Sequence, residues 1–156
     1  MKAIRVNEHG GPEVLAFEDV DTPRIGEGEV LVKVESAGIN FIDTYQRSGL
    51  YQIPLPSTLG LEAAGTVVEA DKSVTGLNIG DKVAYTNVAG AYAEFAAVPA
   101  DKLVPIPEGV SFDQGAAAML QGRVAGEARK GREETLAYLE KSTAQDAAGE
   151  TKKGDK

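Results

Sequence analysis

Four residues that could contact a ligand lie close together in the sequence: Asn40, Asp43, Tyr45 and Tyr51. Several glycines flank them within residues 34–65, at places where the backbone would turn or approach a ligand closely. An amide, a carboxylate and two phenols can hold a polar organic molecule, because tyrosine combines a flat aromatic surface with a hydroxyl donor. No obvious proton-transfer triad accompanies them, so we expect them to supply position and polar contacts.

The composition of the 156-residue chain argues against several other kinds of site. The absence of cysteine excludes disulfides and thiolate metal ligands, and a single histidine, His9, argues against a classical zinc site. The net charge of -8 argues against general nucleic-acid binding, which favours a basic surface. No apolar run is long enough to predict a membrane-spanning helix, and the N-terminus has no signal-peptide core, so we expect a cytoplasmic protein.

A short helix over Asn40–Gly49 is predicted to position the candidate residues. The side-chain oxygen of Asn40 can cap the first turn, and Asp43 places a negative charge near the positive end of the helix. Gly49 suits a left-handed stop at the C-terminal end. The two prolines within residues 54–56 then favour an extended loop.

Most of the first 110 residues are predicted to form short strands separated by turns, a pattern that favours a barrel or a sandwich. Glu29–Glu35 alternates apolar and polar residues with the period of a half-buried strand. A second helix is predicted from Ser111 to Gln121, because Ser111 and Gln114 form an S-x-x-Q capping box. The predicted strands are Ala3–Val6, Val14–Asp19, Glu29–Glu35, Ala63–Ala70, Lys82–Thr86, Ala91–Val98 and Lys102–Ile106.

The composition changes near Gly122, which predicts a boundary between residues 1–122 and residues 123–156. Residues 1–122 carry 8 basic and 17 acidic side chains, a balance of -9, whereas residues 123–156 carry 8 basic and 7 acidic ones, a balance of +1. Residues 123–156 read as a charged, helical or disordered tail of unclear origin. Glu127–Ser142 could form a helix that docks only weakly, and residues 144–156 have the composition of a disordered segment.

Six segments occur in an order that is specific as a set. They read KAIRVNEHGGPEVL, GEVLVKVESAGINFIDTYQRSGLY, LGLEAAGTVVEA, GDKVAY, GAYAEFAAVPADKLVPIP and GVSFDQGAAAMLQG. Together they make residues 1–122 resemble the N-terminal, GroES-like catalytic domain of zinc-free NADPH:quinone oxidoreductases, the zeta-crystallin-like members of the medium-chain dehydrogenase/reductase superfamily. The resemblance implies a mainly β (α+β) fold, a partly open GroES-like barrel with short helices.

The resemblance also implies a reaction, the transfer of a hydride from NADPH to a quinone or another electron-poor small molecule. The catalytic residues that line the cleft would be Asn40, Tyr45 and Tyr51. The cofactor contacts would be Asn40, Asp43, Tyr45 and Gln121, with Asn40 close to the nicotinamide. The resemblance thus gives each of these side chains a place beside the reacting rings.

Each of these residues also has a structural interpretation that the sequence leaves open. Asn40 could be simply a helix cap, and Asp43 a solvated or helix-stabilising charge. The two tyrosines, taken alone, could be core or rim aromatics. For Glu62, an acid among apolar residues, we favour a structural hydrogen-bonding role.

Two departures from the wider superfamily bear on function. Zinc enzymes of the superfamily have a cysteine where this chain has Asn40 and a histidine where it has Leu61, so no metal is expected. Complete relatives continue into a Rossmann domain with a G-x-G-x-x-G turn, and no such turn follows Gly122. We therefore expect weak NADPH binding, weak or absent activity, and self-association through an uncovered domain face.

An alternative function follows from the same departures. The chain could be a non-catalytic GroES-like remnant, or an engineered domain, that acts as a folding or partner-binding module. An engineered excision, a truncated or frameshifted gene product, an alternative transcript and a mosaic gene all fit the sequence.

Overall fold

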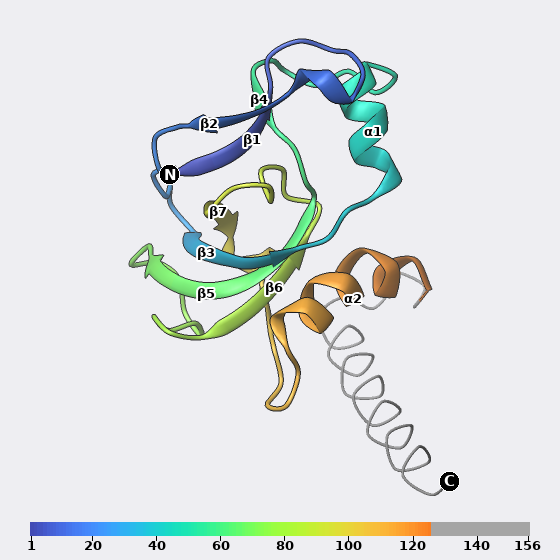
Figure 1. Ribbon diagram of the computed structural model, residues 1–156. Helices are drawn as coiled ribbons and strands as arrows, with labels where there is room; N and C mark the ends of the chain where they lie inside the picture. The colour runs from blue at the N-terminus through green and yellow to red at the C-terminus, as the bar shows by residue number, and fades with distance from the viewer. Residues whose placement is uncertain (126–156) are drawn as a thin grey trace, which may run out of the picture.

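The fold is mainly β with two α-helices, as predicted from the sequence (Figure 1). A computed structural model describes residues 1–125. The predicted helix over Glu127–Ser142 and the segment after it lie outside the described residues. Neither helix in residues 1–125 is long and apolar enough to span a membrane.

The elements are short, as the frequent turn residues in the sequence predict. The strands are β1 (Lys2–Val6), β2 (Leu15–Asp19), β3 (Glu29–Ala37), β4 (Ser57–Thr58), β5 (Glu62–Ala70), β6 (Lys82–Thr86), β7 (Phe95–Pro99) and β8 (Val104–Pro105). The α-helices are α1 (Phe41–Ser48) and α2 (Phe112–Ala125), and 3-10 turns cover Pro12–Val14 and Ala100–Lys102.

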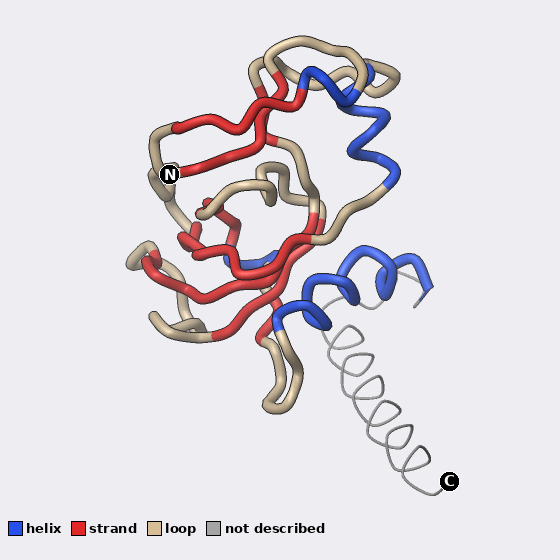
Figure 2. Tube along the Cα trace, viewed as in Figure 1, coloured by secondary structure: helices blue, strands red, loops and turns tan. Residues whose placement is uncertain are grey.

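The strands form two antiparallel sheets that join into a partly open barrel (Figure 2). One sheet has the order β7-β3-β5-β6-β8 and the other the order β2-β1-β4. Residues 92–94 connect the sheets, because Ile4 N–H donates to Tyr92 O at 2.8 Å and Val34 N–H donates to Glu94 O at 2.9 Å. Among the described residues β2 and β8 do not pair with each other, so the barrel stays open between them.

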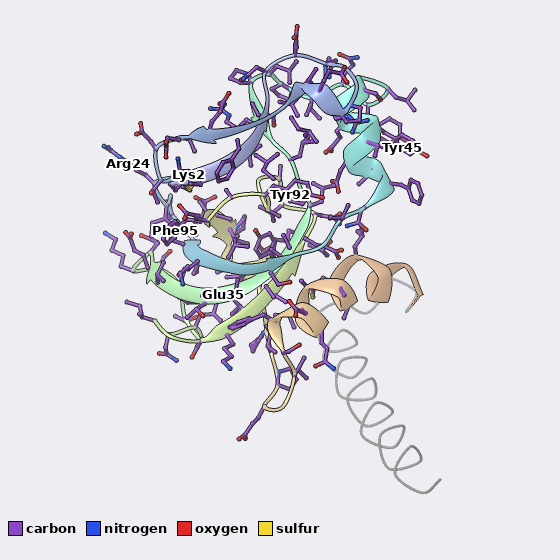
Figure 3. All side chains as sticks on the ribbon, in the orientation of Figure 1. Lys2, Arg24, Glu35, Tyr45, Tyr92 and Phe95 are labelled. Atoms are coloured by element: carbon purple, nitrogen blue, oxygen red, sulfur yellow. The ribbon has the colours of Figure 1, made fainter. Side chains whose placement is uncertain are left out.

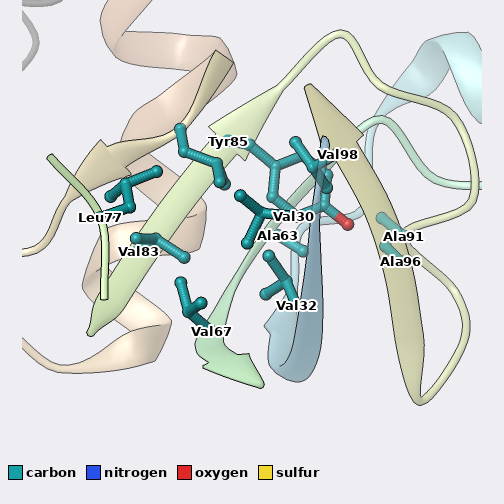
Figure 4. Close-up of a cluster of buried hydrophobic side chains, with 11 residues drawn as sticks. Val30, Val32, Ala63, Val67, Leu77, Val83, Tyr85, Ala91, Ala96 and Val98 are labelled. Carbon is teal, nitrogen blue, oxygen red and sulfur yellow. The ribbon is translucent and has the colours of Figure 1, made fainter. Parts of the chain in front are cut away.

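The two faces of the larger sheet bury separate apolar clusters, which explains the near-continuous burial along β5. Ala63 and Val67 face the barrel interior, whereas Ala64 faces α2. Each fully buried valine removes enough apolar surface from water to stabilise the fold by about 1.5–3 kcal/mol. The interior cluster is Val30, Val32, Ala63, Val67, Leu77, Val83, Tyr85, Ala91, Ala96, Val98 and Leu103 (Figure 4). The cluster under α2 is Ala64, Ala84, Val104, Ala116 and Met119.

Three strands of the structure differ from what the sequence predicts. The predicted strand Ala91–Val98 begins only at Phe95, because residues 92–94 bridge β1 and β3. The predicted strand Lys102–Ile106 is reduced to Val104–Pro105, because a 3-10 turn occupies the preceding residues. Strand β4 was not predicted, since its two residues are held only by pairing with β1.

Helix α2 begins where its capping box predicts. Ser111 N–H donates to Gln114 Oε1 at 3.0 Å, and Gln114 N–H donates to Ser111 Oγ at 3.2 Å. The helix continues to Ala125, three residues beyond the boundary predicted at Gly122. Its contacts with β3, β5 and β6 place it across the outer face of the larger sheet.

Candidate functional site

The predicted ligand-contacting residues lie on and around α1, which follows closely after β3 (Figure 1). Asn40 is the N-cap, with an extended backbone of φ -129° and ψ 154°. Asn40 and Asp43 form a capping box, in which Asp43 Oδ2 accepts a hydrogen bond from Asn40 N–H at 2.8 Å. Gly49 ends the helix with φ 82°, a left-handed conformation that glycine adopts without strain. The predicted helix and both of its ends are confirmed.

Asn40 and Asp43 point into the protein and are almost fully buried. Asn40 is 9% exposed and Asp43 is 5% exposed. The Asn40 side chain donates from Nδ2 to Glu62 Oε1 at 2.8 Å. Asp43 Oδ2 accepts a second bond, from the Tyr92 hydroxyl at 2.6 Å, whereas Asp43 Oδ1 is buried without a partner among the described residues. Asp43 therefore stabilises the start of α1 from the interior, and the interpretation of it as a solvated charge is wrong.

Glu62, at the start of β5, is the second buried carboxylate of the site. It is 2% exposed, and its Oε2 accepts a hydrogen bond from the backbone N–H of Leu120 at 2.6 Å. Among the side chains that the structure describes, no lysine, arginine or histidine forms a salt bridge with Glu62 or Asp43. The predicted hydrogen-bonding role of Glu62 is confirmed, and the partners of its carboxylate within residues 1–125 are the side-chain amide of Asn40 and the backbone amide of Leu120.

Tyr92 is the residue of this network that the sequence did not single out. Its hydroxyl donates to Asp43 and lies 3.3 Å from the carbonyl oxygen of Gly38. Burial, together with the bond to Asp43, raises the pKa of Tyr92 well above its usual value, so the hydroxyl keeps its proton and acts as a donor. Two buried carboxylates that need donors would have been the signal for such a residue.

Tyr45 and Tyr51 lie on the opposite, outer side of α1. Tyr45 is 39% exposed and Tyr51 is 51% exposed, and their rings meet edge to face with centroids 5.4 Å apart and an interplanar angle of 67°. Figure 3 shows Tyr45 pointing outward from α1 and Tyr92 on the inner side. The bond from Tyr51 N–H to Tyr45 O, at 3.0 Å, fixes the two residues together. The two tyrosines are therefore not core residues, and neither hydroxyl has a hydrogen-bond partner among the described residues.

The predicted site residues on and beside α1 fall into two groups: a buried layer on its inner side, here called the base with no acid–base role implied, and an exposed group on its outer side, here called the surface. Asn40 and Asp43 belong to the base, a network that also includes Glu62 and Tyr92, and Tyr45 and Tyr51 form the surface. Gln121 lies in α2, directly after the residue whose N–H reaches Glu62, and its predicted contact with a cofactor stays a prediction.

The base and the surface suit an organic ligand better than a metal ion. No group of three or more metal-ligating side chains occurs among the described residues. Hydrogen bonds of 2.6–2.8 Å hold the base together, and they are buried or partly buried, which favours a single arrangement of its side chains. The surface offers two aromatic rings and two hydroxyl groups that are available as donors.

Comparison with known proteins finds one domain family and a set of similar quinone oxidoreductases. Residues 26–108 match the alcohol dehydrogenase GroES-like domain. A quinone oxidoreductase of Pseudomonas aeruginosa is 43% identical over 152 residues, which cover 96% of this chain and 43% of that protein. Quinone oxidoreductase 1 of Escherichia coli K12 is 46% identical over 121 residues, which cover 76% of this chain and 37% of that protein.

Solved structures give the same result. The Escherichia coli quinone oxidoreductase complexed with NADPH superposes with a TM-score of 0.79 at 42% identity, over 83% of this chain and 41% of that one. The quinone oxidoreductase of Pseudomonas syringae pv. tomato DC3000 superposes with a TM-score of 0.79 at 44% identity, over 83% of this chain and 40% of that one.

The chain spans about two fifths of the length of these relatives. The match to the Pseudomonas aeruginosa protein extends past residue 122, whereas the Escherichia coli match covers 121 residues. The family match, which includes both β3 and α1, covers more than half of the chain and confirms the GroES-like fold implied by the sequence. The chain belongs to the alcohol dehydrogenase GroES-like domain family, and it corresponds to the N-terminal part of quinone oxidoreductases.

Proposed function

We propose that this chain forms one side of the site of a zinc-free, NADPH-dependent quinone oxidoreductase, and that the outer surface of α1 receives a flat, electron-poor ring. The observation that carries the proposal is the exposed pair of Tyr45 and Tyr51, whose hydroxyls have no partner among the described residues. A quinone has a flat ring and two carbonyl oxygens, which complement an aromatic surface with two phenol donors.

The charges of the base indicate which part of NADPH would lie against this chain. Asp43 and Glu62 are buried carboxylates, which would repel the diphosphate of the cofactor. The uncharged nicotinamide ring and its carboxamide fit the amide of Asn40 and the tyrosine surface better. NADPH supplies a hydride when bound, and the residues of this chain would orient the two rings and exclude water between them.

Binding to the intact chain tests the proposal directly. The chain contains five tyrosines and no tryptophan, so tyrosine emission can follow a titration with NADPH or with 1,4-naphthoquinone. Tyr51→Phe is expected to weaken naphthoquinone binding about fivefold, the effect of losing one hydrogen bond. Tyr85→Phe is the matched control, because it also removes one tyrosine hydroxyl but does so in the barrel interior, so the α1 surface is unchanged.

The proposal fails if Tyr51→Phe and Asn40→Ala both leave ligand binding and quinone turnover as they are in the unaltered chain. Absence of any saturable binding by NADPH and by naphthoquinone would also refute it.

A second candidate function is a non-catalytic domain that associates through the same surface. Ile39, Phe41 and Leu50 are strongly exposed beside the tyrosine pair, and clusters of exposed apolar side chains favour association. Sedimentation velocity over a range of concentrations tests this function. Self-association that disappears in Phe41→Ser would support it, and a monomer at every concentration would contradict it.

A further inference from the structure

The Glu62 carboxylate joins three segments that are far apart in the sequence. Glu62 itself belongs to β5, Oε1 accepts from Asn40 Nδ2 at 2.8 Å, and Oε2 accepts from Leu120 N–H at 2.6 Å. The first partner lies 22 residues before Glu62 and the second lies 58 residues after it. One buried side chain therefore connects the N-cap of α1 with the interior of α2.

The Glu62 carboxylate occupies the space beside Gly38 that a side chain at that position would fill. Gly38 N–H donates to the backbone carbonyl of Glu62 at 3.1 Å, which places the two residues against each other. A Cβ atom on Gly38 would overlap the Glu62 carboxylate. Glycine is thus required at position 38 for the carboxylate to reach Asn40.

The bond to α2 occurs at an unusual position. Leu120 lies within α2, where a backbone N–H ordinarily donates to the carbonyl four residues earlier. Its bond to a side chain of β5 shows that this turn of the helix is attached to the sheet by a charge-assisted contact. Met119, the preceding residue, is buried in the cluster between α2 and the sheet. A displacement of α2 would therefore move a donor of Glu62.

We propose that Glu62 is a positioning residue that fixes the side-chain amide of Asn40 and makes its orientation depend on the position of α2. The link runs from Leu120 N–H through the two carboxylate oxygens to Asn40 Nδ2. The part of this inference that concerns ligands rests on the proposed function, because Asn40 would meet the nicotinamide there. The coupling between α2 and Asn40 stands on the geometry alone.

The substitution Glu62→Gln tests the coupling with little change in volume. A carboxylate offers an acceptor to each of two donors, whereas a carboxamide offers one acceptor and one NH₂ group, which would face an N–H. Either one of the two bonds is lost, or the Asn40 amide turns over so that its oxygen accepts from the new NH₂ group; in both cases the present orientation of the Asn40 amide is lost. Glu69→Gln, on the exposed part of the same strand, is the matched control.

Two nuclear magnetic resonance measurements on the full chain read the result without a ligand. Amide exchange of Leu120 is expected to become about fivefold faster in Glu62→Gln, because its hydrogen bond to a carboxylate is either lost or replaced by a weaker bond to a neutral amide oxygen. Met119→Leu changes the shape of a side chain in the cluster between α2 and the sheet, and the repacking is expected to shift α2 slightly and so to move the side-chain NH₂ signals of Asn40. In the Glu62→Gln background the same change should leave the Asn40 signals nearly unmoved, whereas in the Glu69→Gln background they should move as in the unaltered chain.

Equal movement of the Asn40 signals in the Glu62→Gln and Glu69→Gln backgrounds would overturn the inference. If Glu62→Gln does not fold, Asn40→Ala tests the link from its other end, since it should change the exchange rate of Leu120 N–H. An unchanged rate would refute the link.

A naphthoquinone titration then separates this inference from the proposed function. Glu62→Gln is expected to weaken binding by about 3- to 30-fold, the usual range for a residue that acts through another. If the unaltered chain binds neither NADPH nor naphthoquinone, the proposed function fails, while the resonance measurements still decide the coupling.

Discussion

Tyr92→Phe removes the hydroxyl that holds the base of the site, and Tyr85→Phe makes the same chemical change where no bond is lost. The Tyr92 hydroxyl donates to Asp43 at 2.6 Å. Tyr85 is fully buried, and its hydroxyl has no hydrogen-bond partner among the described residues. The two variants differ mainly in whether the deleted oxygen was bonded to a carboxylate.

The structure predicts effects of different size and sign. A hydrogen bond to a charged group contributes about 1.5–3 kcal/mol, and its loss leaves the buried Asp43 carboxylate with only the Asn40 N–H as a donor from the part of the chain that the structure describes. We therefore expect Tyr92→Phe to lower the free energy of unfolding by about 2 kcal/mol. Removing the unsatisfied hydroxyl of Tyr85 should leave the free energy of unfolding unchanged or raise it by up to about 1 kcal/mol.

Urea unfolding followed by circular dichroism distinguishes these outcomes. With a urea dependence of about 1–3 kcal/mol per molar, the midpoints of the two variants should differ by about 1 M or more. The reasoning would be refuted if the two midpoints coincided, or if Tyr85→Phe were the less stable variant.

Three further predictions concern close packing and pH. Gly60→Ala should destabilise the fold by about 1–3 kcal/mol more than Gly109→Ala. Both glycines have a positive φ, but only at Gly60 would a new Cβ meet another side chain, at 2.6 Å from Tyr92 Cδ1. Equal melting temperatures of the two variants would contradict this prediction. Gly65→Ala should prevent folding, because its Cβ would overlap the backbone carbonyl of Lys33 in β3, and a native circular dichroism spectrum would refute the overlap. The raised pKa values of Tyr85 and Tyr92 predict that the free energy of unfolding falls as the pH rises above about 10. The reason is that the unfolded chain then releases phenol protons that the folded chain retains. A free energy of unfolding that stays constant from about pH 9 to about pH 11 would count against this prediction.

Elements defined by short-range signals could be predicted from the sequence. The N-cap Asn40, the left-handed Gly49 and the capping box at Ser111 each act within one helical turn, and all three are found in the structure. The alternating pattern of Glu29–Glu35 likewise depends only on which face of a strand is buried. Strand β4 depends on a partner some fifty positions away, and no local pattern indicates such a partner.

The same distinction explains the candidate site. The residue types in α1 indicate a ligand surface, but they do not show that Asn40 and Asp43 point inward while Tyr45 points outward. Inward orientation is decided by Tyr92 and Glu62, which lie 49 and 22 positions from their partners. An acid among apolar residues could indicate burial, but the donors that satisfy it come from other elements.

The shared carboxylate of Asp43 has a consequence for how the protein opens. Its Oδ2 caps α1 and at the same time accepts a hydrogen bond from Tyr92, which belongs to the segment 92–94 that connects the two sheets. A helix as short as α1 is only marginally stable by itself. Fraying of the first turn would therefore break a contact of the barrel, so the Asn40 N–H that donates to Asp43 should exchange slowly with solvent. The surface that carries Tyr45 and the barrel behind it then form a single cooperative unit.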